Sequence, residues 1–443
     1  MQGKKQFRNS LLHIIARAAT AALAMAVVLA LTVVLTQSAQ AQSPATGGIW
    51  TEKVLHSFGS INNDGAGPYA GLIFDAAGNL YGTTGYGGTY NVGTVFELTP
   101  NGSGGWTEQV LHSFGSINND GAGPYAGLIF DAAGNLYGTT TSGGTYSDGT
   151  VFKLTPTTGG GWTEQVLHNF NGDGYDPRAG LIFDATGNLY GMTEGGNGDY
   201  PDGTVFELTP TAGEGWTAKV LHGFNGADGL YPWLGSLIFD GAGDLYGTTL
   251  EGGTYGAGVV FELMPAAGGS WTETVLHSFN DNGTDGALPA AGLIFDAAGN
   301  LYGTTNAGGT YDAGTVFKLA PTGDGSWTET VLHNFGNGTD GALPAAGLIF
   351  DAAGNLYGTT EVGGFYGDGT VFELTPNGSG GWTEQVLFSF NLADGWYPYA
   401  GLILDAAGNL YGTTYTGGTY TYGTVFELTP VYPCAKCSHS VLR

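Results

Sequence analysis

The stretch AGLIFDAAGNLYGTT at residues 70–84 decides the fold, because the chain repeats it, with small changes, seven times. Each copy leads into a Gly-rich loop, a segment like GTVFELTP (residues 93–100) and a segment like WTEQVLHSF (residues 106–114). A repeat of about 40–50 residues that carries four short strands is typical of a β-propeller blade. The units begin at Trp50, Trp106, Trp162, Trp216, Trp271, Trp327 and Trp382. We therefore expect an all-β fold, a seven-bladed β-propeller with four strands per blade.

The order of the strands within a blade follows from their composition. GLIFD (residues 71–75) is nearly all apolar and is expected to be the innermost strand, covered on both faces. NLYGTT (residues 79–84) returns from it through a tight turn at Gly78. TVFELT (residues 94–99) alternates in polarity, as a half-buried third strand would. WTEQVLHSF carries the most polar residues and is expected to lie outermost.

The repeat region starts with an outer strand (residues 50–58) and ends with a third strand (residues 424–429). We expect the first strand to complete the last blade, because an open array would expose a free sheet edge. We divide the chain into a signal peptide (1–41), a short linker (42–49), the seven-repeat propeller (50–430) and a C-terminal tail (431–443).

Composition limits the partners and the location. The net charge is −27, so nucleic acid and anionic membrane surfaces are poor partners. The leader has a basic start, an apolar run and Ala39-Gln40-Ala41, which fits signal-peptidase cleavage, although an uncleaved anchor is the alternative. We expect a secreted or cell-surface protein, monomeric and not inserted in the membrane after cleavage. The repeats contain no cysteine, so packing must hold the ring closed.

The runs GLIFDAAGNLYGTT and GGTYxxGTVFEL resemble the bacterial GloVer tandem repeat, found in secreted "choice-of-anchor" proteins. The resemblance covers residues 50–430 and implies export and a propeller-like array. It implies no established activity. The chain ends in VYPCAKCSHSVLR, which has neither an apolar span nor a sorting signal, and Cys434 and Cys437 are expected to form a local disulfide or to pair between chains.

An Asp-Gly pair recurs in every loop that leads from an outer strand to the next inner strand. Seven carboxylates of this kind could form a ring near the channel mouth and hold calcium, but Asp-Gly is also ordinary turn chemistry. We expect turn formation to dominate, no required cofactor and at most weak, multi-site calcium binding. The seven residues are Asp64, Asp120, Asp173, Asp228, Asp285, Asp340 and Asp394.

Aromatic residues are the candidate ligand-binding groups, since exposed rings on a rigid rim can stack on sugars. One set recurs after the Gly-Gly of the second-to-third loop, where each ring could instead pack over a neighbouring blade: Tyr90, Tyr146, Tyr255, Tyr311, Tyr366 and Tyr420. A second set varies between repeats and lies in the outer-to-inner loops with the cation Arg178: Tyr69, Tyr125, Trp233, Trp396, Tyr397 and Tyr399.

No catalytic residue stands out. A histidine recurs in six outer strands, and Phe388 takes its place in the seventh, which favours a packing role. We expect a non-catalytic binding or scaffold propeller for polysaccharide or a surface protein. The alternatives are an extracellular lyase or glycosidase and a purely structural cell-surface protein. Whether the chain is an enzyme stays open, with a binding role favoured.

Overall fold

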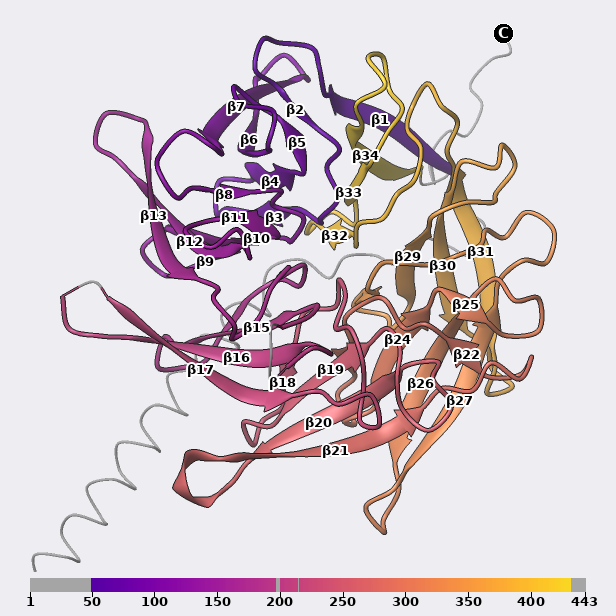
Figure 1. The fold of residues 1–443 in the computed structure, drawn as a ribbon. Coiled ribbons are helices and arrows are strands. Elements are labelled where there is room, and N and C mark those ends of the chain that lie inside the picture. Colours follow the sequence, from indigo (N-terminus) through magenta and orange to yellow (C-terminus); the bar gives the residue numbers. More distant parts are fainter. Residues whose placement is uncertain (1–48, 197–199, 214, 432–443) are drawn as a thin grey trace, which may run out of the picture.

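The computed structural model describes residues 49–196, 200–213 and 215–431, and these form seven four-stranded antiparallel sheets arranged as a seven-bladed β-propeller (Figure 1). The predicted fold class is confirmed. The leader and the tail, with Cys434 and Cys437, lie outside the described residues. No helix in the described part of the chain is long and apolar enough to cross a membrane.

Each blade is a sheet of four strands, which follow one another in order from the central axis to the outside. The innermost strands are β3 (Ile73–Phe74), β9 (Ile129–Phe130), β14 (Ile182–Phe183), β18 (Ile238–Phe239), β23 (Ile294–Phe295), β28 (Ile349–Phe350) and β32 (Ile403–Leu404). The second strands are β4 (Leu80–Thr84), β10 (Leu136–Thr140), β15 (Leu189–Thr193), β19 (Leu245–Thr249), β24 (Leu301–Thr305), β29 (Leu356–Thr360) and β33 (Leu410–Thr414).

The third strands are β6 (Thr94–Pro100), β12 (Thr150–Pro156), β16 (Thr204–Pro210), β20 (Val259–Pro265), β26 (Thr315–Pro321), β30 (Thr370–Pro376) and β34 (Thr424–Val431). The outer strands are β7 (Trp106–Ser113), β13 (Trp162–Asn169), β17 (Trp216–Gly223), β21 (Trp271–Ser278), β27 (Trp327–Asn334), β31 (Trp382–Ser389) and β1 (Ile49–Ser57).

Short pairs in the loops complete the described elements: β2 (Gly65–Ala66) with β5 (Tyr86–Gly87), β8 (Gly121–Ala122) with β11 (Ser142–Gly143), and β22 (Gly286–Ala287) with β25 (Ala307–Gly308). One turn of 3-10 helix, Ala267–Gly269, lies between β20 and β21.

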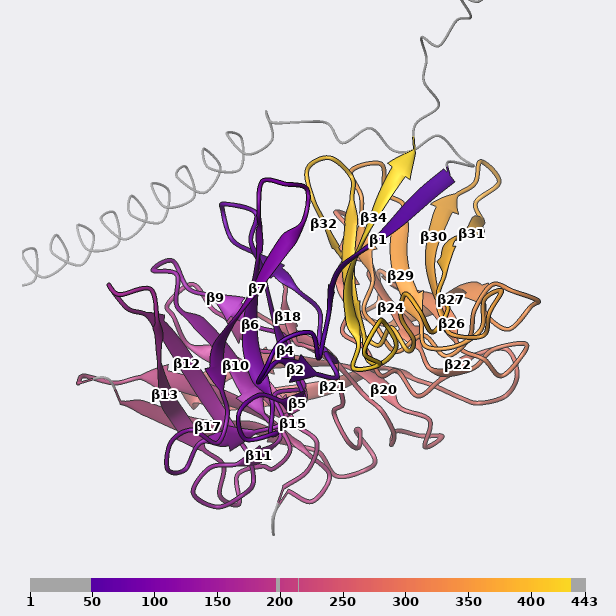
Figure 2. The same cartoon turned by 90° about the horizontal axis from the view of Figure 1, so that it is seen from above.

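The ring closes as predicted. Strand β1 lies antiparallel beside β34, with Trp50 opposite Pro430 and Ser57 opposite Thr424, so the last blade contains both ends of the repeat region (Figure 2). The Thr413 hydroxyl also donates a hydrogen bond to the Ala70 carbonyl, 3.1 Å away, which links the last blade to the first. The same bond joins other neighbouring blades, as from Thr83 to Ala126 at 3.0 Å. Closure thus rests on main-chain pairing and on a repeated contact between blades.

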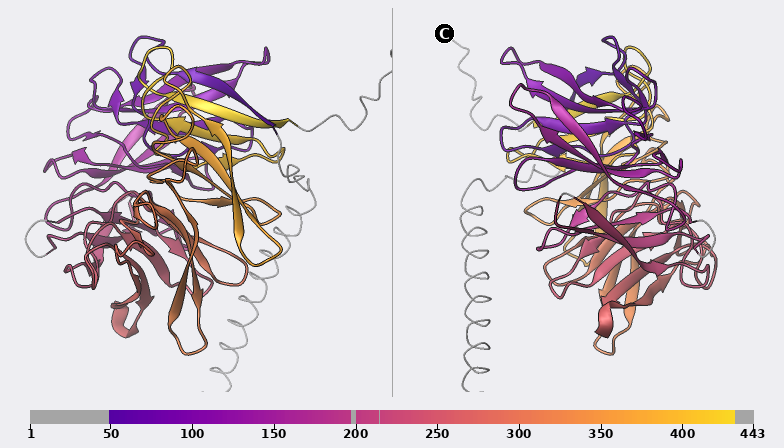
Figure 3. Two further views of the ribbon diagram at one scale, coloured as in Figure 1. Left: turned by 90° about the vertical axis from the view of Figure 1, so that its right-hand side faces the viewer. Right: turned by 60° about the vertical axis from the view of Figure 1, so that its left-hand side comes forward.

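The hydrophobic core lies between blades, which stand face to face around the axis (Figure 3). Phe96 packs with Val425 of the last blade, whereas its sequence neighbour Val95 packs with Phe152 of the next blade. Val95 and Phe96 are both fully buried. The expectation of a half-buried third strand was therefore wrong, because each blade is covered on both faces by its neighbours.

The innermost strands are shorter than the predicted five residues, because the ladder begins only at the Ile-Phe pair. The residues before that pair instead line the central channel, where the inner strands of neighbouring blades lie close to one another. A Cβ added to Gly71 would lie 3.2 Å from the Gly401 carbonyl oxygen of the neighbouring blade, and one added to Gly292 would lie 3.0 Å from that of Ser236. Six of the seven inner strands have glycine at this position and the seventh has Ser236, so only small residues stand where the inner strands meet around the axis.

Candidate functional site

Every loop from an outer strand to the next inner strand contains a proline, and the residue directly after it forms what we call the mouth position. The residue before this proline has a left-handed backbone in every blade: Gly67, Gly123, Asp176, Tyr231, Leu288, Leu343 and Tyr397. Such a conformation is uncommon for residues other than glycine, so the loop holds the proline and its successor in a defined direction. The mouth positions are Tyr69, Tyr125, Arg178, Trp233, Ala290, Ala345 and Tyr399.

A cavity of about 270 Å³ opens on the axis at these loops. Its wall includes Tyr69, Tyr125, Arg178 and Tyr399, and the channel-lining glycines form its deeper part. On the opposite side of the axis the wall is made of small residues, including Ala345. The cavity is therefore aromatic on one side and alanine-lined on the other.

The aromatic side is a stack of rings that continues outward from the cavity. Tyr69 and Tyr399 stack at 4.5 Å between ring centroids, and Tyr399 continues to Tyr397 at 5.8 Å. Tyr397 stacks on Trp396 at 4.3 Å. Tyr125 meets Tyr69 edge to face at 5.5 Å. Parallel packing of this kind fixes the rings before any ligand arrives, and it leaves mainly edges and hydroxyls free for contact.

The phenol groups of Tyr69 and Tyr399 stay neutral. Burial, followed by the nearby Glu361 carboxylate, raises the pKa of Tyr69 to about 12. Burial and the 2.8 Å hydrogen bond that Tyr399 donates to Glu361 raise the pKa of Tyr399 as well. Neutral phenols can both donate and accept hydrogen bonds, which suits a ligand that carries many hydroxyl groups.

Arg178 is the cation of the cavity and is held by two carboxylates. Its guanidinium binds Asp176 at 2.8 Å and Glu194 at 2.7 Å, and its carbon lies 4.5 Å from the centroid of the Trp233 ring. It also lies 5.7 Å from the Tyr125 ring. Because its Nε and Nη2 groups already bind two carboxylates, Arg178 serves to position rings more than to attract an anion.

The structure thus brings the second predicted aromatic set together with Arg178 at one face of the channel. The first set lies apart from the cavity, at the edge of the blades, and its rings are about half exposed. Their exposed fractions are 54% for Tyr90, 52% for Tyr146, 60% for Tyr255, 50% for Tyr311, 59% for Tyr366 and 46% for Tyr420. They contact the outer-to-inner loop of their own blade, as Tyr90 does at Gly115.

The seven aspartates offered as an alternative carboxylate ring are not among the residues that line the cavity, and weak calcium binding by them stays a prediction. The aspartates Asp64, Asp120, Asp173, Asp228, Asp285 and Asp340 each pair with the histidine of the preceding outer strand, away from the cavity. The seventh, Asp394, is held by Asn391. Turn chemistry is present as expected, since Asp64 accepts hydrogen bonds from the backbone amides of Gly59, Ser60 and Gly65.

The histidines are the residues that sequence reasoning underrated. His56 Nε2 lies 3.2 Å from Asp64 Oδ2, so the position holds a polar pair, with Phe58 packed edge to face beside the imidazole ring. A weak signal was available in the sequence, because an aspartate follows each of these histidines after five to eight residues. It could not be separated from turn chemistry without knowing that the loop folds back over its own strand.

Comparison with known proteins places the chain by its repeats. The model of the Gloeobacter/Verrucomicrobia repeat matches residues 42–200 and 272–439. A search of curated proteins finds no match.

Several solved structures match the chain at low sequence identity. PorZ, a surface component of the type-IX secretion system of Porphyromonas gingivalis, is 16% identical with a TM-score of 0.49, over 83% of this chain and 47% of its own. A provisional oxidoreductase (glucose dehydrogenase) of Thermus thermophilus is 18% identical with a TM-score of 0.43, over 71% and 98%. A Dyadobacter fermentans protein of unknown function is 10% identical with a TM-score of 0.39, over 86% and 98%. Such distant likeness adds nothing to a functional argument, whereas the repeat match spans most of the sequence. The chain therefore belongs to the Gloeobacter/Verrucomicrobia repeat family.

Proposed function

We propose that this protein is a non-catalytic binding propeller outside the cell, and that it holds a neutral polysaccharide at the aromatic side of its channel mouth. One observation carries the proposal. In five consecutive blades the mouth position is Tyr399, Tyr69, Tyr125, Arg178 and Trp233, whereas the two remaining blades have Ala290 and Ala345. A repeated frame that varies at one position, on one side of a cavity, is the arrangement expected of a surface that recognises a ligand.

The chemistry of the mouth favours a neutral sugar over a charged one. Sugars combine apolar ring faces with many hydroxyls, and the mouth offers ring edges together with neutral phenol groups. The paired state of Arg178 and the carboxylates of Asp176, Glu194 and Glu361 disfavour an anionic chain. The net charge of −27 acts in the same direction.

Binding of neutral glucan, mannan and xylan oligosaccharides on an array, followed by titration calorimetry, tests the proposal. We expect Tyr69→Ala and Tyr399→Ala, whose rings line the cavity, each to weaken binding about tenfold, as loss of about 1.4 kcal/mol of aromatic contact would. Tyr255→Ala is the matched control, because this tyrosine is 60% exposed on its own loop and does not line the cavity. Equal losses in the control would contradict the mouth as the site. Turnover of the polysaccharide would make the protein an enzyme, and binding only to a surface protein would replace the sugar as ligand.

A further inference from the structure

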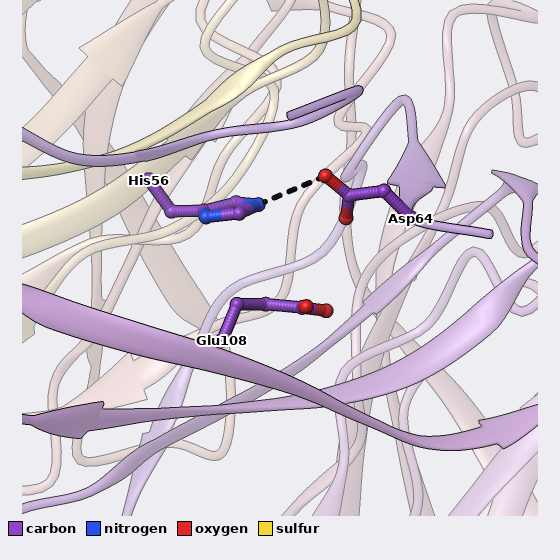
Figure 4. Close-up of side chains that lie close together, drawn as sticks. All are labelled: His56, Asp64 and Glu108. Atoms are coloured by element: carbon purple, nitrogen blue, oxygen red, sulfur yellow. Dashed lines mark hydrogen bonds and ion pairs between the residues drawn. The ribbon is translucent and has the colours of Figure 1, made fainter. Parts of the chain in front are cut away.

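Neighbouring blades also meet at their outer strands, and we call each such contact a blade junction. A histidine of one outer strand, the aspartate of the following loop and a glutamate of the next outer strand come together there. Figure 4 shows His56 on β1, Asp64 on its loop and Glu108 on β7 directed toward a common space. One ligand atom from each of these residues lies within 4.8 Å of the others.

Two more junctions reach the same geometry. They consist of His112, Asp120 and Glu164, and of His222, Asp228 and Glu273. The histidine-to-aspartate distances in these two sets are 3.3 and 3.4 Å. Because each set draws residues from two outer strands, its geometry is a property of the closed ring and not of a single repeat.

The glutamates of these sets carry shielded oxygens without hydrogen-bond partners, whereas Asp64 and Asp228 are well supplied with donors. The side chains of Asp64 and Asp120 are only 2% and 1% exposed. Both oxygens of Glu108, both oxygens of Glu164 and Oδ1 of Asp120 are shielded from solvent and accept no hydrogen bond. In the described part of the chain, no lysine or arginine forms an ion pair with any of them. Buried carboxylates normally require a hydrogen-bond donor, a counter-charge or a metal.

We infer that these three junctions are binding sites for a divalent transition-metal ion of the zinc class, each built from one imidazole nitrogen and two carboxylates. Zinc at about 2.0–2.1 Å from its ligands separates tetrahedral neighbours by about 3.3 Å, close to the His56–Asp64 distance of 3.2 Å. Two carboxylates balance the charge of the ion. Calcium fits less well, since it takes six or more oxygen ligands. Each ion would link two neighbouring blades in a ring whose repeats contain no cysteine and so no disulfide bond.

Two junctions of the same molecule lack one member of the set and serve as internal controls. Ala218 replaces the glutamate beside the His168–Asp173 pair, and Phe388 replaces the histidine beside Asp394 and Glu52. The remaining two junctions carry all three residue types but are not among those whose ligand atoms lie within 4.8 Å of one another. They are His277, Asp285 and Glu329, and His333, Asp340 and Glu384. We therefore expect three sites per chain.

The test uses the full secreted chain, stripped with a chelator and titrated with Zn²⁺ alone by calorimetry, with metal analysis after dialysis. Wild type should bind three ions and melt at a higher temperature once loaded. Glu108→Gln should bind two, and the combined Glu108→Gln, Glu164→Gln and Glu273→Gln variant should bind none. Glu52→Gln, the same substitution at the junction without histidine, should still bind three.

Glutamine keeps the shape of the side chain and removes its charge, so the variants are expected to remain folded, and circular dichroism checks this. Three ions still bound by the combined variant would overturn the inference, because the zinc would then lie elsewhere. Absence of binding by wild type at micromolar Zn²⁺ would show that protons alone fill these spaces. A melting shift that Ca²⁺ or NaCl reproduces would reduce the effect to general relief of negative charge.

Discussion

The channel mouth and the blade junctions are built from the same repeat, but the residue at the mouth varies from blade to blade, whereas the residues at the junctions are mostly kept. The mouth position changes from Tyr69 to Arg178 to Ala290 around the ring, while the junction keeps histidine, aspartate and glutamate in most blades. The mouth faces one cavity that several blades share, so its seven members need not be alike. Each junction solves the same contact between two blades. Sequence variation between repeats therefore marks the channel mouth, which all blades share, and sequence constancy marks the blade junction, which involves only two neighbouring blades.

The largest expected effect comes from removing a junction strand altogether. A chain lacking residues 49–57 loses β1, leaves β34 with a free edge and takes Trp50 and Leu55 out of the core. We expect it to aggregate through that edge and to show no cooperative melt. Size-exclusion chromatography and circular dichroism, with a chain starting at residue 49 as control, measure this. A monomer with an unchanged melting temperature would show that closure is dispensable.

An intermediate effect should follow from making the two halves of the mouth alike. Ala345→Tyr extends the aromatic side around the axis, and we expect it to tighten neutral-oligosaccharide binding about 2- to 10-fold, as about 0.5–1.5 kcal/mol of ring contact would. Ala266→Tyr adds the same ring on an exposed loop outside the cavity and should change nothing. Weaker binding, with the melting temperature retained, would show that the alanine side must stay open for the ligand.

The smallest effect concerns the junction that has no histidine. Burial, and then Asp394, raises the pKa of Glu52 to about 7, above the unfolded value near 4.5. Its contribution to stability is thus fully present below pH 4.5 and is lost as pH rises through 7. Glu52→Gln cannot ionise, so it should melt above wild type at pH 8 by a few degrees and match it at pH 5.

Asp324→Asn is the control for that measurement. Hydrogen bonds from the Thr322 and Ser326 side chains lower the pKa of Asp324 to about 2, so its titration is complete well below pH 5. Its melting temperature relative to wild type should not change between pH 5 and 8. A Glu52→Gln variant that behaves in the same way would show that Glu52 is solvated in the folded protein.

The repeat count, the order of strands and the closing strand were predictable, because each follows from periodicity and from the need to cover a sheet edge. The burial of Val95 was not, since it depends on a second blade that faces the first. The blade junctions could not be predicted from the sequence either, because they too are contacts between two neighbouring blades. His56 and Glu108 lie more than fifty residues apart and meet only across two outer strands, so Phe388 at one junction suggested packing for all.

The aromatic residues of the loops were predictable as candidates but not as a cluster. Tyr69 and Tyr399 are separated by most of the chain, and their stacking at 4.5 Å depends on ring closure. The outward continuation to Trp396 depends on the left-handed backbone of Tyr397. The peripheral set headed by Tyr90 looked equally suitable in the sequence, because a one-dimensional pattern does not give the distance of a loop from the axis.

The close approach of the inner strands at Gly71, Gly292 and Gly401 has a consequence for how this chain can evolve. Nearly identical neighbouring repeats, such as those at residues 51–84 and 107–140, invite unequal recombination that adds or drops a whole unit. Six units would bring the inner strands closer together than their present spacing, and eight would draw them apart and widen the channel. We expect the small residues at these inner positions, glycine in six blades and Ser236 in the other, to fit the channel to seven blades and so to disfavour such recombinants.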